Sequence, residues 1–321
     1  MLYNELSRGE RIRGGLDGLL IGDALGVPYE FHDASDIPLL HEIEMEPPTG
    51  FHRAHSGVPI GTWSDDGAQA LCLVDSLVHD PKLNLDDLGR RLLAWYQTGY
   101  MTPDGRVFDV GIQTSEAMHA LQRGIEAGKA GPNRERANGN GALMRCLPVV
   151  FFARGEDDVI DLAMRQGLVT HGHARSQLSC ALYALTASYV LEGGQVEDGL
   201  QKAEAELARR FSGGEFASEF DLILDAKGGP LRGSGYVVDC LWSALDCLLT
   251  TSNYADCVRK AISLGNDTDT TACVAGGIAG LLYGYRGIPD HWREALKGKS
   301  SVEAQLNQLE QLGLWPERGH R

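Results

Sequence analysis

Two short segments each place a hydroxyl side chain and two carboxylates at the start of an expected helix. They are Ser64, Asp65 and Asp66 in "GTWSDDGAQALCL", and Asp267, Asp269 and Thr270 in "SLGNDTDTTA". No lysine or arginine lies close to the second segment, so its carboxylates would be costly to bury without another cation. Ordinary helix capping is the alternative, because Ser, Thr and Asp are favoured at helix N-termini. Capping uses one side chain, however, and leaves the second carboxylate of each segment unexplained.

A third acid, Glu30, lies near the end of "GLLIGDALGVPYEF" (18–31). If the three segments converge, five carboxylates and two hydroxyls face one another. The pKa values of these carboxylates would rise strongly unless a cation lay between them. All of the donors are hard oxygen atoms, and neither Cys nor His lies among them. The sequence therefore points to Mg²⁺ or Mn²⁺, as a single ion or a pair, rather than to structural zinc.

Two glycine-rich stretches are the third candidate feature. Gly105 and Gly111 flank Asp109 in "TPDGRVFDVG". The stretch "RANGNGALMRCLPV" alternates small residues ahead of an expected helix, in the order Asn138, Gly139, Asn140 and Gly141. Turns of this kind expose backbone N–H groups that suit a phosphate or diphosphate. Asn-Gly also marks plain turns, so a purely structural role stays open.

The elements that must position these residues are predominantly helical. Apolar residues recur at three- and four-residue spacing in nine segments, at 69–80, 85–99, 112–128, 157–171, 175–193, 196–211, 235–249, 254–265 and 269–284. Strand-like alternation is scarce, and the short apolar run 147–153 is assigned to a helix as well. No shift in composition marks a linker. We therefore expect an all-α protein with one compact domain over residues 1–321.

A long stretch without a helical period, 32–61, contains several histidines, namely His32, His41, His52 and His55. A His-x-x-His pair in such a loop could bind zinc. The alternative interpretation is a solvated loop that is broken by prolines. The spacing of the histidines leaves both interpretations open.

Composition and charge exclude several classes of function. Hydrophobic residues make up 43% of the chain and charged residues 23%, which is typical of a soluble globular protein. The net charge of −15 repels phosphate groups, so we expect neither nucleic-acid binding nor an anionic-membrane role. Nothing at the N-terminus reads as a signal peptide, and no apolar run is long enough to span a membrane. The seven cysteines include no CxxC pair, and we expect buried free thiols in a cytoplasmic protein.

Taken together and in order, the motifs resemble the ADP-ribosylglycohydrolase family. The resemblance runs from about residue 12 to 284 and is carried by "GLLIGDALGVPYEF", "GTWSDDG", "DGRVFDVG", "NGNGALMR", "THGHARS", "GSGYVVDCLWSAL" and "LGNDTDTTACVAGGIAGLLYG". The paired Ser-Asp-Asp and Asp-x-Asp-Thr motifs are its most specific part. The similarity is greatest to the branch that contains dinitrogenase-reductase-activating glycohydrolases and ADP-ribosylarginine hydrolases.

The resemblance implies a compact orthogonal helical bundle with two Mg²⁺ or Mn²⁺ ions at the mouth of a cleft. It assigns the metal ligands to Ser64, Asp65, Asp66, Asp267, Asp269 and Thr270. Glu30 would lie beside the metals as a ligand or as a catalytic carboxylate. The two glycine-rich stretches, at Gly105–Gly111 and Asn138–Gly141, would hold the diphosphate and ribose of ADP-ribose. His171 and Tyr236 would lie near the nucleotide, with Tyr236 stacked on adenine.

Two of these residues have plain structural alternatives. A histidine near a helix end, such as His171, is commonly a favourable C-terminal charge. Tyr236 could equally be a core aromatic of an amphipathic helix. The sequence leaves both assignments open.

The reaction implied is hydrolysis of the bond between C1″ of ADP-ribose and a protein side chain, most simply arginine. The metals would grip the ribose hydroxyls. Glu30 or Asp66 would take a proton from water, and Asp109 would contact the guanidinium leaving group. The substrate would be an ADP-ribosylated protein and the product free ADP-ribose. The alternatives are a hydrolase of serine-linked or small-molecule ADP-ribose conjugates, and a non-catalytic binding or structural member of the fold.

The sequence departs from the family pattern in three places. Relatives usually carry Thr where Ser64 stands, a change that keeps the hydroxyl. They often carry Thr or Ser where Gly67 stands, and the glycine is expected to loosen the first turn of its helix. The loop 32–61 also looks longer than is typical, which leaves the choice of target protein open.

Overall fold

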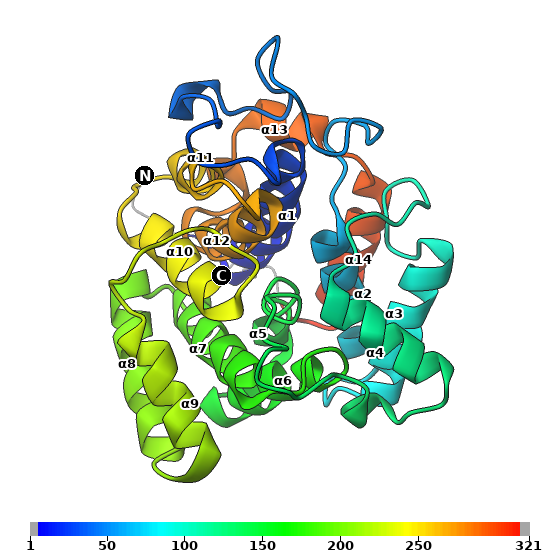
Figure 1. Ribbon diagram of the computed structural model, residues 1–321, viewed down its shortest axis with the longest axis vertical. Helices are drawn as coiled ribbons and strands as arrows, with labels where there is room; N and C mark the ends of the chain where they lie inside the picture. Colours follow the sequence, from blue (N-terminus) through cyan, green and yellow to red (C-terminus); the bar gives the residue numbers. More distant parts are fainter. Residues whose placement is uncertain (1–5, 315–321) are drawn as a thin grey trace, which may run out of the picture.

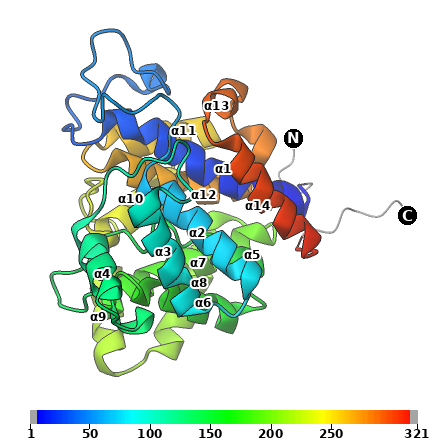
Figure 2. The ribbon, with the colours of Figure 1, turned by 90° about the vertical axis from the view of Figure 1, so that its right-hand side faces the viewer.

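Two helices buried on nearly every face run side by side through the middle of the molecule (Figures 1 and 2). They are α1 (Arg8–Gly26) and α12 (Thr268–Tyr283). Small residues let their backbones approach closely. A Cβ atom on Gly18 would lie 2.5 Å from the carbonyl oxygen of Gly276, and one on Gly26 would lie 2.5 Å from the backbone nitrogen of Asp269. The end of α1 therefore lies directly against the start of α12.

The structure, a computed structural model, describes residues 6–314. Within that range the other α-helices are α2 (Asp65–His79), α3 (Leu85–Thr98), α4 (Ile112–Gln122), α5 (Val149–Phe152), α6 (Glu156–Leu168), α7 (Ala174–Leu191), α8 (Val196–Arg210), α9 (Gly214–Asp225), α10 (Val237–Leu249), α11 (Tyr254–Ser263), α13 (Asp290–Ala295) and α14 (Lys299–Gln311). Short 3₁₀ turns lie at Val27–Tyr29, Leu40–Glu42, Ala127–Lys129 and Tyr285–Gly287. The described chain contains only isolated β-bridges and no strand, so the prediction of an all-α fold is confirmed.

Each of the nine predicted helical segments contains a helix, and the run 147–153 contains α5. The helices α1, α9, α13 and α14 were not predicted. In α1 the reason is physical: six glycines lower helix propensity, and burial on nearly all sides removes the polar face that reveals a helical period. The ends of the predicted domain, residues 1–5 and 315–321, lie outside the described residues.

Two further expectations from the sequence concern the cysteines and membrane-spanning segments. All seven cysteines are buried and free, as predicted. Among the described residues, no helix combines the length and the apolar character needed to cross a bilayer.

Candidate active site

The start of α2 is fixed by a carboxylate from α1. Ser64 is the N-cap of α2, and its hydroxyl accepts a hydrogen bond from the backbone N–H of Asp66 at 3.3 Å. Asp23, which is fully buried in α1, accepts from the backbone N–H groups of Ser64 and Gly67, both at 2.8 Å. Burial nevertheless raises the pKa of Asp23 to about 7. The expected loosening at Gly67 is absent here, because Asp23 holds that turn and the side chains of Leu20 and Trp63 crowd the glycine.

The three acidic segments converge. The hydroxyl of Thr270 donates to Oδ1 of Asp66 at 3.3 Å, which joins the start of α12 to the start of α2. Glu30, Asp267 and Asp269 each place a carboxylate oxygen within 4.8 Å of the other two. Helix capping accounts for Ser64, but it does not account for this gathering of acids from three separate segments.

The buried carboxylates repel one another. Burial, followed by the charge of neighbouring acids, raises the pKa values of Asp65, Asp66 and Asp269 well above the usual range and that of Glu30 to about 11. The same causes raise the pKa of Asp109 to about 6. Among the described residues, Oδ2 of Asp66 and Oδ2 of Asp269 are buried and accept no hydrogen bond. Asp66 and Asp269 thus each offer one unsatisfied oxygen, and the surrounding donors are hard oxygen atoms. Such a set could hold a metal ion.

A cavity of about 210 Å³ opens beside these acids. Most of the candidate residues line it, namely Glu30, Asp65, Asp66, Asp109, Gly111, Gly139, Asn140, Gly141, His171, Asp267 and Thr270. Five candidates are not part of its wall: Ser64, Gly105, Asn138, Tyr236 and Asp269. Sequence analysis did not single out Ile112, Gln113, Thr114, Met144 or Gly235, which complete the wall.

The Asn-Gly turn is tied to the second acidic segment. The amide of Asn140 donates to Oδ2 of Asp267 at 2.9 Å. A Cβ on Gly141 would lie 2.8 Å from Cε1 of His171, so the turn needs a glycine at this position. Asn138 instead makes structural contacts, because its amide group bonds to the carbonyl of Glu135 and to the ring of His173.

His171 is held neutral in the cavity wall. His171 is 2% exposed and burial lowers its pKa to about 3, which does not fit the alternative of a favourable charge after the end of α6. The hydroxyl of Thr170 accepts from Arg145, and it lies 2.9 Å from Nδ1 of His171. This contact fixes the orientation of the ring, with Nε2 on the side of the Asn-Gly turn.

Tyr236 is not a core aromatic, since it is the N-cap of α10 and is 38% exposed. Its hydroxyl accepts from Arg175 at 3.2 Å. It pairs with Gly139 through a β-bridge, so it lies next to the Asn-Gly turn without lining the cavity.

A fully buried arginine, Arg145, ties the site together. Its five hydrogen bonds all go to neutral acceptors. They reach the carbonyl of Gly141 at 2.9 Å, the hydroxyl of Thr170 at 2.7 Å and Oε1 of Gln69 at 2.8 Å. Gln69 in turn donates to Oδ2 of Asp65 at 2.9 Å. Burial lowers the pKa of Arg145 to about 10. The only sequence signal for this role is a charge inside the apolar run "ALMRCLPVV".

The loop 32–61 is largely exposed, but two of its histidines reach the site. Nε2 of His55 lies 2.6 Å from Oε2 of Glu30, and Nδ1 of His32 lies 2.9 Å from the carbonyl of Glu30. His55 shares a possible metal-binding group with Glu30 and Asp109, and His52 belongs to no such group among the described residues. The structure therefore supports neither a His-x-x-His zinc site nor a merely solvated loop.

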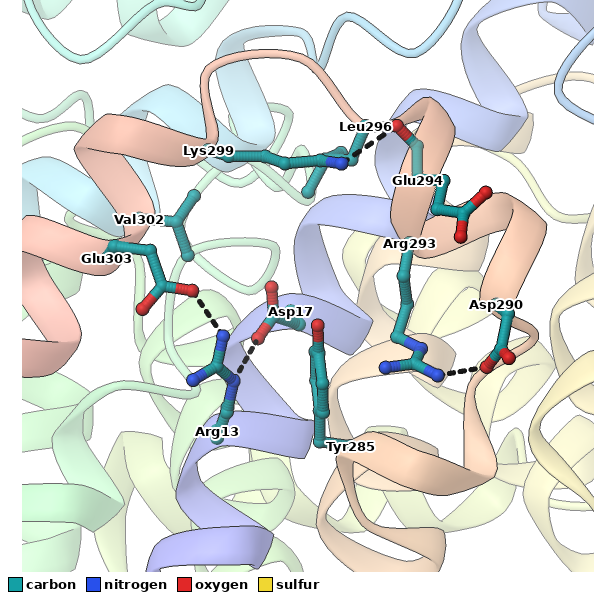
Figure 3. Close-up of a pocket in the computed structure, with 10 residues that line it drawn as sticks. All are labelled: Arg13, Asp17, Tyr285, Asp290, Arg293, Glu294, Leu296, Lys299, Val302 and Glu303. Carbon is teal, nitrogen blue, oxygen red and sulfur yellow. Dashed lines mark hydrogen bonds and ion pairs between the residues drawn. The ribbon is translucent and has the colours of Figure 1, made fainter.

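A second cavity, of about 260 Å³, lies between α1, α13 and α14 (Figure 3). Its charges are largely paired with one another: Arg13 contacts Glu303, and Arg293 contacts Asp290. The ring of Tyr285 lies between the two guanidinium groups, which are 4.4 and 4.3 Å from its centroid. This cavity shares no residue with the acidic one, and three of its acids, Asp17, Asp290 and Glu303, each have an arginine beside them.

The comparisons with known proteins agree with this geometry. The family model for ADP-ribosylglycohydrolase matches residues 4–318. An ADP-ribosylarginine hydrolase, Tri1, of Serratia proteamaculans (strain 568) is 30% identical over 306 residues, which cover 94% of this chain and 79% of that protein. An ADP-ribosyl-[dinitrogen reductase] glycohydrolase of Rhodospirillum rubrum is 28% identical, and the alignment covers 92% of each of the two chains.

A solved structure described as an ADP-ribosylglycohydrolase-related protein complex superposes with a TM-score of 0.77 at 29% identity. The superposition covers 95% of this chain and 99% of that one. The helical fold, the acidic cavity and these matches agree with one another, and the chain belongs to the ADP-ribosylglycohydrolase family.

Proposed function

We propose that the protein is a metal-dependent hydrolase that removes ADP-ribose from modified arginine side chains of proteins. The observation that carries the proposal is the pair of unsatisfied buried oxygens, on Asp66 and on Asp269, which face the same acidic cluster from two helices. Buried carboxylates in this number are stable only if protonated or if paired with cations. Two relatives, an ADP-ribosylarginine hydrolase and an ADP-ribosyl-[dinitrogen reductase] glycohydrolase, support the choice of substrate.

The residues proposed to hold two Mg²⁺ or Mn²⁺ ions are those of the two acidic segments, Ser64, Asp65, Asp66, Asp267, Asp269 and Thr270. When bound, such ions would orient the ribose hydroxyls and make a nearby water more acidic. Asn140 keeps Asp267 oriented, and Asp23 keeps the start of α2 in place. The site therefore has a supporting layer of hydrogen bonds around its proposed ligands.

Glu30 and Asp109 are the proposed acid–base carboxylates. A hydrogen bond links them, and the pKa of Glu30 is raised further than that of Asp109. Two carboxylates whose pKa values are pushed apart can hold one proton between them. In the proposed mechanism the pKa values of Glu30 and Asp66 would be lowered by a bound cation, and one of them, once ionised, would take a proton from the attacking water. Asp109 contacts the guanidinium group that leaves when the bond to C1″ breaks.

The nucleotide part of the substrate is assigned to the Asn-Gly side of the cavity. The turn at Gly139–Gly141 brings backbone close to the open space, and the imidazole of His171 lines the same part of the cavity as a polar group for a ligand. Tyr236 lies next to that turn and stays our candidate for stacking on adenine. Gly105 is no longer included, because a Cβ there would meet nothing within 4 Å and the residue does not line the cavity.

The test is release of free ADP-ribose from an arginine-ADP-ribosylated protein with Mg²⁺, with Mn²⁺ and with EDTA. We expect release that depends on the metal. A serine-ADP-ribosylated protein is the matched control for linkage. Release from the serine-linked protein alone would assign the other linkage, and tight binding of ADP-ribose without any release would assign a binding protein.

A further inference from the structure

Strained backbone gathers around the acidic cavity. The described chain has six non-glycine residues with positive φ, and four of them lie at this site: Phe31 (64°), His55 (48°), Asp109 (54°) and Asn266 (59°). Phe31 follows Glu30, and Asn266 precedes Asp267. A bulky residue such as Phe is a real outlier in this region of backbone conformation. Strain of this kind persists only where the surrounding structure enforces it, and it concentrates at functional sites.

The strain at Phe31 holds an apolar ring out in solvent. The backbone N–H of Phe31 donates to the carbonyl of Asn266 at 2.7 Å, so the loop of the second acidic segment fixes its position. Its ring, 70% exposed, packs on one side against the ring of His55, with 5.5 Å between centroids. His55 packs in turn against Phe108 at 5.1 Å. The ring is therefore supported from behind while most of its surface stays open.

A second exposed apolar side chain stands at the same cavity. Ile112, the first residue of α4, lines the cavity and is 72% exposed. Phe31 and Ile112 are the two most exposed large hydrophobic residues in the described part of the chain. Phe31 is not part of the cavity wall, but it follows Glu30, which is, and it packs on His55, which contacts Glu30. Single exposed apolar residues need no explanation, but a pair beside one acidic site does.

Charge identifies the kind of occupant. The cavity wall carries five acids, and the described residues that line it include neither lysine nor arginine. The adenine of the nucleotide is already assigned to Tyr236 beside the Asn-Gly turn, and its ribose and diphosphate groups are hydrophilic. The nucleotide therefore leaves Phe31 and Ile112 without a partner. A polypeptide that presents apolar side chains next to a cationic residue satisfies both features, because its apolar groups cover the rim and its cation meets the acids.

We propose that Phe31 and Ile112 form a docking rim for the polypeptide that carries the ADP-ribosyl group, favouring apolar over acidic residues beside the modified arginine. The proposal rests on the proposed function. It concerns the polypeptide part of the substrate, which the nucleotide pocket does not contact. It makes the protein selective for the sequence around the modified residue as well as for the modification.

The test compares a protein-like substrate with a small one. The substrates are an arginine-ADP-ribosylated peptide with leucine on both sides, the same peptide with glutamate on both sides, and free ADP-ribosylarginine. The measured quantity is the ratio of kcat/KM for the leucine peptide to kcat/KM for free ADP-ribosylarginine. In Phe31→Ala and Ile112→Ala this ratio is expected to fall about five- to tenfold, the loss typical of a contact residue at an interface. The conservative variants Phe31→Leu and Ile112→Val are expected to restore most of it.

The matched control is Leu222→Ala, which removes an exposed apolar side chain from α9. It is expected to keep the wild-type ratio. If the ratio is the same in wild type, Phe31→Ala and Ile112→Ala, the docking rim is wrong, whereas the proposed hydrolase activity still stands. Equal turnover of the leucine and glutamate peptides by wild type would also overturn it. If wild type sediments as a dimer and Phe31→Ala sediments as a monomer, the exposed side chains instead form a contact with a second copy of the chain. If wild type releases ADP-ribose from none of the three substrates, the proposed function is wrong, and the docking rim that depends on it is wrong as well.

Discussion

Gly26 at the end of α1 lies against Asp269 in the first turn of α12, with no room for a side chain between them. Asp269 is one of the proposed metal ligands. The close approach of two helices is therefore what brings Glu30, four residues after Gly26, beside the second acidic segment.

Replacing Gly26 by Ala is expected to weaken metal binding. Its Cβ would meet backbone atoms of Thr268 and Asp269, which cannot move as a flexible side chain can. We expect Mn²⁺ affinity in calorimetry to fall by about tenfold and unfolding free energy to fall by about 1–3 kcal/mol. The control is Gly213→Ala, where an added Cβ would meet nothing within 4 Å. Wild-type affinity in Gly26→Ala would show that the helix contact does not position Asp269.

Asp269→Asn is expected to change thermal stability in opposite directions with and without metal. In EDTA, folding must either bury the charge of Asp269 or protonate the residue, and asparagine avoids this cost, so the Tm of the variant should exceed that of wild type. With Mn²⁺, wild type should gain several degrees that the variant lacks, because a ligand that binds only the folded state stabilises it. Asp161→Asn, on the exposed surface of α6, should show neither effect. An equal metal-induced gain in wild type and Asp269→Asn would remove Asp269 from the ligand set.

The acidic clusters could be predicted because their information is local. Asp65 and Asp66, like Asp267 and Asp269, are too close in sequence to be explained by capping alone, and the structure brings the two pairs together. The roles of Asp23 and Arg145 could not be predicted, because each depends on partners that lie far away in the sequence. The helix α1 was hidden for a related reason: a helix that is buried all round has no amphipathic period.

Arg145→Lys is expected to impair both halves of the site. A lysine cannot bridge Gln69, Gly141 and Thr170 at once, because it lacks the planar fork of donors. We expect affinities for ADP-ribose and for Mn²⁺ to fall together, each by about tenfold, with a loss of stability of about 2–4 kcal/mol. The control is Arg210→Lys, an exposed ion pair with Asp157. A loss of stability without any loss of either affinity would make Arg145 a structural residue only.

Asp17, in the second cavity, is expected to make stability depend on pH. The residue is 7% exposed, and burial raises its pKa from 3.8 to about 7, against the opposing effect of Arg13 (Figure 3). The folded state therefore binds more protons than the unfolded state between these values. The stabilising contribution is complete below pH 3.8 and is lost as pH rises through 7.

Asp17→Asn tests this sign. Relative to wild type, the variant should gain about 1–3 kcal/mol in unfolding free energy between pH 5 and pH 8, measured by urea titration. The neighbouring Arg13 and Arg293 stay cationic over this range, because the pKa of each is raised, so the difference between the two proteins reports Asp17. A constant difference between pH 5 and pH 8 would mean that Asp17 is already ionised in the folded state.

Asp109→Asn is expected to lower kcat for arginine-linked substrate by about a hundredfold or more, because it removes the carboxylate proposed to meet the guanidinium leaving group. Asp109 lines the cavity, is held with φ at 54° and shares a hydrogen bond with Glu30, so the amide can occupy the same place without the charge. Affinity for the product ADP-ribose, which has no guanidinium, should change little. Asp104→Asn in the same loop is the control, since Asp104 pairs with Arg106 at the surface. If kcat stays at the wild-type value while KM rises, Asp109 binds the substrate without assisting bond cleavage, and the catalytic carboxylate must be sought in Glu30 or Asp66.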